Sequence, residues 1–169
     1  MGGGISMSFA AQHPQEVASL WLIDCAGIAE APPSELAKIV TATGANPLMI
    51  TQESDYPAFI RFVMSDPPWI PGSVMDALAR ERIANQDLER EVFQQIATDS
   101  VSGAVKGLAT PTLIVWGDED RALSVGTVPV LEALLPNARA VVMPHVGHAP
   151  MIERPQQTAE DYLRFRASL

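Results

Sequence analysis

The sequence is poor in cysteine and in basic side chains, and it lacks long apolar runs. Its single cysteine, Cys25, cannot close a disulfide within the chain or supply a cysteine-rich metal cluster. Eleven lysine and arginine residues stand against 20 aspartate and glutamate residues, a net charge of -9, so the chain offers no basic stripe for nucleic acid phosphates. No run is long enough to span a bilayer as a helix. The available chemistry is that of serine, histidine and carboxylate side chains.

What is present indicates a globular protein. The chain has 169 residues, of which 47% are apolar, enough for about one domain with a buried core. Its beginning does not have the pattern of a signal peptide, which leaves localisation open, with the cytoplasm as the default. The histidine and carboxylate spacings are not those of a metal site, and no glycine-rich phosphate loop is complete. We therefore expect neither a metal nor a cofactor.

Three short apolar segments predict the strands of a parallel sheet: residues 17–25, 111–116 and 138–143. Their nearly continuous apolarity is typical of strands buried on both faces. Small and apolar residues predict flanking helices over 4–12 and 128–135. A closing surface helix is predicted over 153–169, with Pro155 in its first turn and Leu163 on its apolar side.

Residues 30–107 differ in character, because they are helical in pattern, interrupted by prolines and without a clear strand. One helix is expected to begin near Ser73, as a capped start. An insertion of this kind between two parallel strands predicts a cap over the carboxyl edge of the sheet. The predicted organisation is a core segment at 1–29, a helical cap at 30–107 and a second core segment at 108–169.

The apolar side chains of the cap have two interpretations. They form either an ordinary helical core or the wall of an acyl-binding pocket. On the second interpretation, we expect substrate contacts from Phe59, Val63 and Trp69, together with Met151 from the C-terminal segment.

Two loops carry the side chains that point to catalysis. Residues 116–120 (WGDED) follow one predicted strand, and residues 145–150 (HVGHAP) follow the next. The carboxyl ends of parallel strands meet at one edge of a sheet, so a carboxylate and an imidazole are expected to meet there. Such a pair is part of a nucleophilic relay, in which the carboxylate orients the imidazole and the imidazole takes a proton from a hydroxyl. The pattern lacks a nucleophile.

The sequence resembles the α/β-hydrolase superfamily. In that family the nucleophilic serine lies in Gly-x-Ser-x-Gly, at a sharp turn between a strand and a helix. The opening Met1-Gly2-Gly3 is similar to the residues just after that serine. The resemblance implies a nucleophile one place before Met1 and, if the chain were intact, an oxyanion-hole donor at the backbone amide of Met1. The implied fold class is α/β, the C-terminal portion of an α/β-hydrolase with parallel strands, flanking helices and an inserted cap.

Three motifs resemble the bacterial lipases and carboxylesterases of family V: residues 46–50 (NPLMI), 67–71 (PPWIP) and 143–155 (MPHVGHAPMIERP). This resemblance implies a small acyl ester as substrate, hydrolysed by a Ser-Asp-His mechanism. Haloalkane dehalogenases, epoxide hydrolases and C–C bond hydrolases share the scaffold and remain alternatives. A further alternative is a catalytically incomplete chain with a binding or structural role.

The family pattern places the acid at Asp120 and the base at His148. Asp118 is the alternative acid, although a turn residue is expected to bond its own backbone. His145 is the competing imidazole and is expected at the rim of the loop.

Three side chains within the sequence could be taken for the missing nucleophile. Ser6 and Ser8 fall inside a predicted helix, and Cys25 ends a predicted strand, where a buried thiol is inert. None of them has the geometry of the family's serine. The strand predicted at 17–25 would also have an unpaired side, so we expect self-association or a companion segment that carries the missing half.

Overall fold

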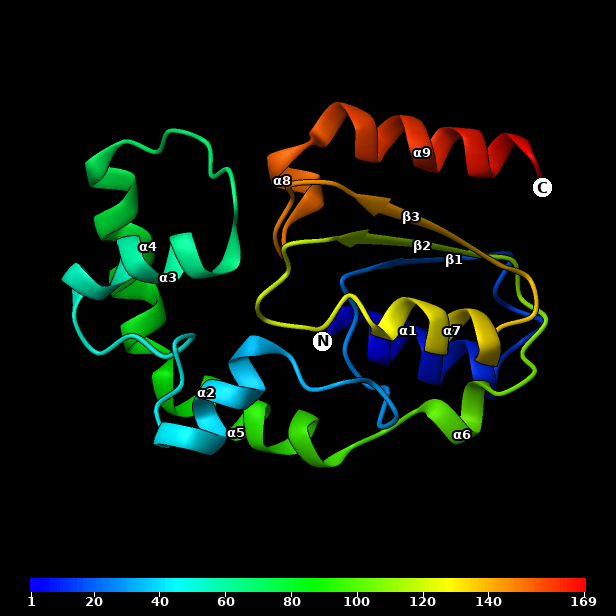
Figure 1. Ribbon diagram of the computed structural model, residues 1–169, viewed down its shortest axis with the longest axis horizontal. Helices are drawn as coiled ribbons and strands as arrows, with labels where there is room; N and C mark the ends of the chain where they lie inside the picture. Colours follow the sequence, from blue (N-terminus) through cyan, green and yellow to red (C-terminus); the bar gives the residue numbers. More distant parts are fainter.

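The computed structural model describes the backbone of residues 1–169 and the side chains of residues 1–95 and 99–169. Its sheet contains parallel strands in the order β1-β2-β3, namely β1 (Leu20–Ile23), β2 (Thr112–Gly117) and β3 (Ala138–Met143). Ile23 pairs with Val115, and Gly117 pairs with Met143. The strands therefore end at a common edge, and helices cover both faces (Figure 1). The predicted α/β class is confirmed.

The sheet separates two apolar layers. Helices α1 (Gly2–Gln12) and α7 (Thr127–Leu134) cover one face, and α9 (Pro155–Ala167) covers the other (Figure 1). Every residue of β2 is buried, and its side chains alternate between the two layers. Ile114 and Trp116 pack in the layer of α1 and α7, whereas Leu113 and Val115 pack in the layer of α9. Burial on both faces explains why the strand is almost continuously apolar.

The first strand is shorter than the prediction of 17–25. Strand β1 ends at Ile23, because the next residue, Asp24, has a positive φ of 40° and turns the chain out of the extended conformation. The backbone N–H of Asp24 still donates to the carbonyl of Val115, at 3.1 Å. The carboxyl group of Asp24 is thereby fixed at the edge where the strands end.

The predicted closing helix is present as α9, with Pro155 in its first turn, but it starts later than 153 and the predicted position of Leu163 on its apolar side is wrong. A short helix α8 (Pro150–Glu153) precedes α9, and the second helix begins at Pro155 because proline suits the first helical position. Helix α9 buries a stripe of Thr158, Asp161 and Phe165 against the sheet, while Leu163 is exposed. Leu163 therefore lies off the buried side of the helix.

Residues 30–107 lie within the segment that connects β1 to β2, and they keep here the name of the predicted cap. Its elements are α2 (Glu35–Thr43), the 3₁₀ turn η1 (Glu53–Asp55), α3 (Tyr56–Val63), α4 (Gly72–Ala84), α5 (Gln86–Thr98) and α6 (Ser102–Val105). Ile50, Tyr56, Ile60 and Ala79 form a small core within it. Of the helices in the described part of the chain, none combines the length and apolarity needed to cross a membrane.

The predicted capped start at Ser73 is wrong. Helix α4 begins at Gly72, and the carbonyl of Pro71 accepts the N–H groups of Val74 and Met75. Ser73 therefore lies within the first turn instead of before it. The fixed φ of proline sets the direction in which the chain enters this helix.

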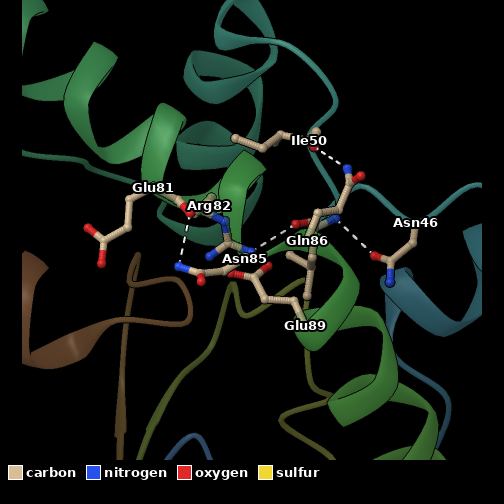
Figure 2. A network of polar contacts seen from close by, with 8 residues as sticks. Asn46, Ile50, Glu81, Arg82, Asn85, Gln86 and Glu89 are labelled. Carbon is tan, nitrogen blue, oxygen red and sulfur yellow. Dashed lines mark hydrogen bonds and ion pairs between the residues drawn. The ribbon is translucent and has the colours of Figure 1, made fainter.

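Polar contacts around Arg82 fix the loop at 46–50 to the junction of α4 and α5 (Figure 2). The Arg82 guanidinium donates to the Glu89 carboxylate at 2.8 Å and to the Leu48 carbonyl at 3.0 Å. It also lies 4.2 Å from the centre of the Phe59 ring, a cation–π contact. Gln86 donates to the carbonyl of Ile50, as Figure 2 shows. These bonds hold one side of the cap together through charged side chains as well as apolar ones.

Candidate active site

The turn that follows β2 presents a buried carboxylate. One oxygen of Asp120, Oδ1, accepts the backbone N–H groups of Ala122 and Leu123 at 2.8 and 2.9 Å. The other oxygen, Oδ2, lies 2.8 Å from Nδ1 of His148. Bonds from backbone amides favour the charged form of a carboxylate and fix its orientation. The structure thus brings the two predicted residues together as an acid–imidazole pair.

The loop that carries His148 is held by its backbone. The N–H of His148 donates to the carbonyl of Val63 at the end of α3, at 2.7 Å. The side chain is about 30% exposed, so the imidazole is not sealed in the core. With Nδ1 directed to a carboxylate, the other ring nitrogen, Nε2, is left to exchange a proton with a reacting group.

Two glycines allow the loops of the acid and the imidazole to touch. A Cβ atom added to Gly117, at the end of β2, would lie 2.1 Å from the carbonyl oxygen of Gly147. A Cβ on Gly147 would lie 2.5 Å from the carbonyl oxygen of Val63. Backbone atoms cannot move aside cheaply, so glycine is required at both positions. The site is therefore assembled by close approach of three backbone segments.

Glu153 is a functional candidate that the sequence did not reveal. Its Oε2 accepts the N–H groups of Ser65 and Asp66, both at 2.8 Å, and its Oε1 accepts the N–H of Gly147 at 2.9 Å. The carboxylate is buried and joins the cap to the histidine loop. The only signal was an acidic residue five positions after His148, in a segment where we predicted the first turn of a surface helix.

Asp24 is the second candidate that we missed. It is buried directly after β1, and its Oδ1 accepts the N–H of Gly117 at 3.0 Å. Burial, followed by repulsion from Asp120, raises the pKa of Asp24 to about 9, although the Gly117 N–H opposes the shift. The rule that pointed to Asp120 and His148 applies here too, because a polar residue follows a buried strand. The strand predicted at 17–25 extends past Asp24, so the prediction does not place this residue at the edge of the sheet.

Asp24, Asp120 and His148 form a compact group at the edge of the sheet. One oxygen or nitrogen atom of each lies within 4.8 Å of those of the other two. We assign no metal to them, because both oxygens of Asp120 are already engaged by amides and by the imidazole. The arrangement is that of an acid–base pair with a third carboxyl group beside it.

Asp118 and His145, the alternatives to the pair, lie outside it. We expected Asp118 to bond its own turn, which is wrong, because its carboxylate accepts the N–H of His145 at 2.7 Å across the two loops. The His145 ring is exposed and lies 3.0 Å from a Glu119 oxygen, a contact that raises the pKa of His145. These residues stabilise the contact between the loops.

The side chains considered as substitute nucleophiles are engaged elsewhere. The Ser6 hydroxyl donates to the carbonyl of Gly2, and the Ser8 hydroxyl accepts from Gln12, both within α1. Cys25 is buried, and desolvation together with Asp24 raises the pKa of its thiol to about 12. A thiol with this pKa is protonated at neutral pH and is a poor nucleophile.

Met1 lies near the edge where the strands end. The first turn of α1 packs so closely on the residues after Asp24 that a Cβ on Gly3 would be 2.2 Å from Cβ of Cys25. Figure 1 shows the N-terminus on the side of the sheet toward which the strands point. Met1 also lines a groove of about 370 Å³ with Ile5, Phe9 and Val101.

The four residues predicted to contact substrate occupy different environments. Phe59 is partly buried beneath Arg82 and lines a depression of about 520 Å³ on the cap. Val63 contributes its carbonyl to the N–H of His148. Trp69 is 86% exposed in the loop between α3 and α4, and Met151 is about half exposed in α8. Their role toward a substrate stays a prediction.

A parallel sheet with an acid and a histidine in successive loops at its carboxyl edge defines a class of hydrolases. The family model of the α/β hydrolase fold matches residues 1–155 of this chain. The chain therefore belongs to the α/β-hydrolase fold family, and the resemblance inferred from its motifs is confirmed.

Two curated relatives in this family are lipases. The chain is 41% identical over 172 residues to Lipase 3 of Moraxella sp. (strain TA144) and 40% identical over 172 residues to Lipase 1 of Psychrobacter immobilis. Each match covers 100% of this chain and 54% of the relative. A crystal structure described as that of a membrane phospholipase A, a bacterial virulence factor, superposes with a TM-score of 0.92 at 34% identity, over 98% of this chain and 54% of that one. The chain thus spans about half the length of these proteins.

Proposed function

We propose that this chain supplies the acid and the base of a serine hydrolase that cleaves small acyl esters. The observation that carries the proposal is the 2.8 Å contact between Asp120 Oδ2 and His148 Nδ1 at the carboxyl edge of the sheet. The names of the relatives, lipases and a phospholipase, support an acyl ester as the substrate class.

In this proposal, His148 takes the proton of a serine hydroxyl as the serine attacks the ester carbonyl, and then donates it to the leaving alcohol. Asp120 keeps Nδ1 protonated and stabilises the imidazolium that forms. In an intact protein, in which a residue precedes Met1, the backbone amide of Met1 is proposed as one donor to the oxyanion, from the family resemblance. Phe59, Val63, Trp69 and Met151 are the proposed contacts of the acyl chain, with 30–107 acting as the cap between core segments 1–29 and 108–169.

The proposal is tested by complementation. The chain is co-expressed with the part of the Psychrobacter lipase that it does not match, and hydrolysis of p-nitrophenyl esters is measured. We expect no product burst from the chain alone and turnover from the mixture, because the resemblance places the serine in the unmatched part. Turnover must disappear in His148→Ala. Turnover by the chain alone that His148→Ala abolishes would contradict the proposal, since it would require a nucleophile within residues 1–169.

We further propose that a companion segment pairs with the outer edge of β1. In the described sheet β1 pairs with β2, which leaves its other edge free to accept a strand. Helix α1, which packs on β1, also exposes the apolar side chains of Ile5 and Phe9. Surfaces of this kind are typical of interfaces.

Light scattering measures this association. The chain alone is expected to self-associate, and the chain mixed with the unmatched part of the lipase is expected to form a defined complex. If the chain remains a stable 18.2 kDa monomer both alone and in the mixture, the edge needs no partner.

A further inference from the structure

Asp24 stands closer to the acid–base pair than its place in the sequence suggests. It follows β1, whereas Asp120 follows β2, and the two strands are neighbours in the sheet. Its Oδ1 accepts the N–H of Gly117, the last residue of β2 and the start of the turn that carries Asp120. Its Oδ2 is buried and has no hydrogen-bond partner among the described residues. One oxygen of the Asp24 carboxyl group thus bonds to the turn that carries Asp120, and the other oxygen has no partner among the described residues.

The charges around this group decide where a proton resides. Asp120 accepts two amide bonds and faces an imidazole, so negative charge is well stabilised on Asp120. A second anion within 4.8 Å, buried from water, would be repelled by it. Glu153 adds to this repulsion, and the Cys25 thiol beside it is neutral at physiological pH. Of the two neighbouring carboxyl groups, Asp24 is the one that keeps a proton, in accord with its pKa of about 9.

We propose that Asp24 is a positioning residue of the Asp120–His148 pair, which as a neutral carboxylic acid fixes the Gly117 amide without adding a second negative charge. As a role in catalysis, this inference rests on the function proposed above. An ionised Asp24 would stabilise the His148 imidazolium and so hinder the return of its proton to the leaving group. A neutral Asp24 holds the turn in place and leaves one carboxylate to act on the imidazole.

The first experiment locates the proton. The chain is labelled with ¹³C at the aspartate carboxyl groups, and the infrared band of a protonated carboxyl group is followed with pH. We expect a band at pH 7 that disappears with a midpoint near pH 9, that is absent in Asp24→Asn and that persists in the control Asp118→Asn. Absence of the band at pH 7, or its persistence in Asp24→Asn, would overturn the proposal.

The second experiment separates positioning from a merely structural role. The ring Cε1–H shift of His148, assigned with His148→Gln, is measured between pH 7 and pH 10. In the unaltered chain this shift is expected to change as Asp24 ionises near pH 9, and in Asp24→Asn that change should be lost. The same change in both proteins would overturn the proposal.

Asparagine is the suitable replacement for two reasons. It keeps an oxygen acceptor for the Gly117 N–H, and it tolerates the positive φ of 40° at this position better than most residues. Neither experiment requires ester hydrolysis. Failure of the Asp24 proposal therefore leaves the proposed hydrolase function standing, and a failed complementation leaves the position of the proton measurable.

Discussion

Replacement of Asp120 by asparagine is expected to lower kcat of the complemented esterase about 10⁴-fold, the loss seen when the acid of a serine triad becomes an amide. The two backbone amides that hold Oδ1 would remain satisfied by an amide oxygen, so the turn should keep its shape. The lost feature is the charge that orients the His148 ring through Nδ1 and stabilises its protonated form. Steady-state hydrolysis of p-nitrophenyl esters, with circular dichroism to verify folding, measures the effect.

Asp118→Asn is the matched control, because it makes the same chemical change two residues away. Asp118 accepts the N–H of His145 and makes no hydrogen bond to Asp120 or His148 among the described residues, so its amide variant should retain kcat within a few-fold. Equal losses of kcat in the two variants would contradict the assignment of Asp120 as the acid. A large loss in Asp118→Asn alone would make Asp118 the acid.

Replacement of Glu153 by alanine is expected to lower the free energy of unfolding by about 1–3 kcal/mol, the cost of leaving a buried donor without an acceptor. Three backbone N–H groups, those of Ser65, Asp66 and Gly147, would lose their acceptor at once. The Gly147 N–H is the buried one, whereas Ser65 and Asp66 are exposed and their N–H groups can bond to water instead. Urea denaturation followed by tryptophan fluorescence gives the value.

Glu160→Ala serves as the control for this variant. Glu160 lies on the exposed side of α9 and accepts only from Gln156, so its loss should change the free energy of unfolding by less than about 0.5 kcal/mol. A Glu153 variant as stable as the control would show that the carboxylate does not hold the two segments together.

The parts of this fold that could be predicted are those encoded by local pattern. The apolar strands at 111–116 and 138–143 appeared almost where we expected them, because burial on both faces leaves a strong local signal. The loops that follow them place Asp120 and His148 at one edge of the predicted sheet. Parallel strands impose this arrangement whatever the side chains are.

The parts that could not be predicted depend on contacts between distant residues. Glu153 accepts a hydrogen bond from the N–H of Ser65, 88 positions earlier. Asp24 accepts one from the N–H of Gly117, 93 positions later. In the sequence, both are ordinary acidic residues near the end of an element. Only the fold shows that each is buried and bonded to the backbone of another loop.

The bonds of residues 63–66 have a consequence for how the molecule can move. The carbonyl of Val63 and the N–H groups of Ser65 and Asp66 are tied to the histidine loop, directly at His148 or through Glu153. A displacement of α3 would have to break these bonds or move the His148 loop with it. If a ligand bound against α3 and shifted it, ligand binding and the alignment of the imidazole would therefore be coupled.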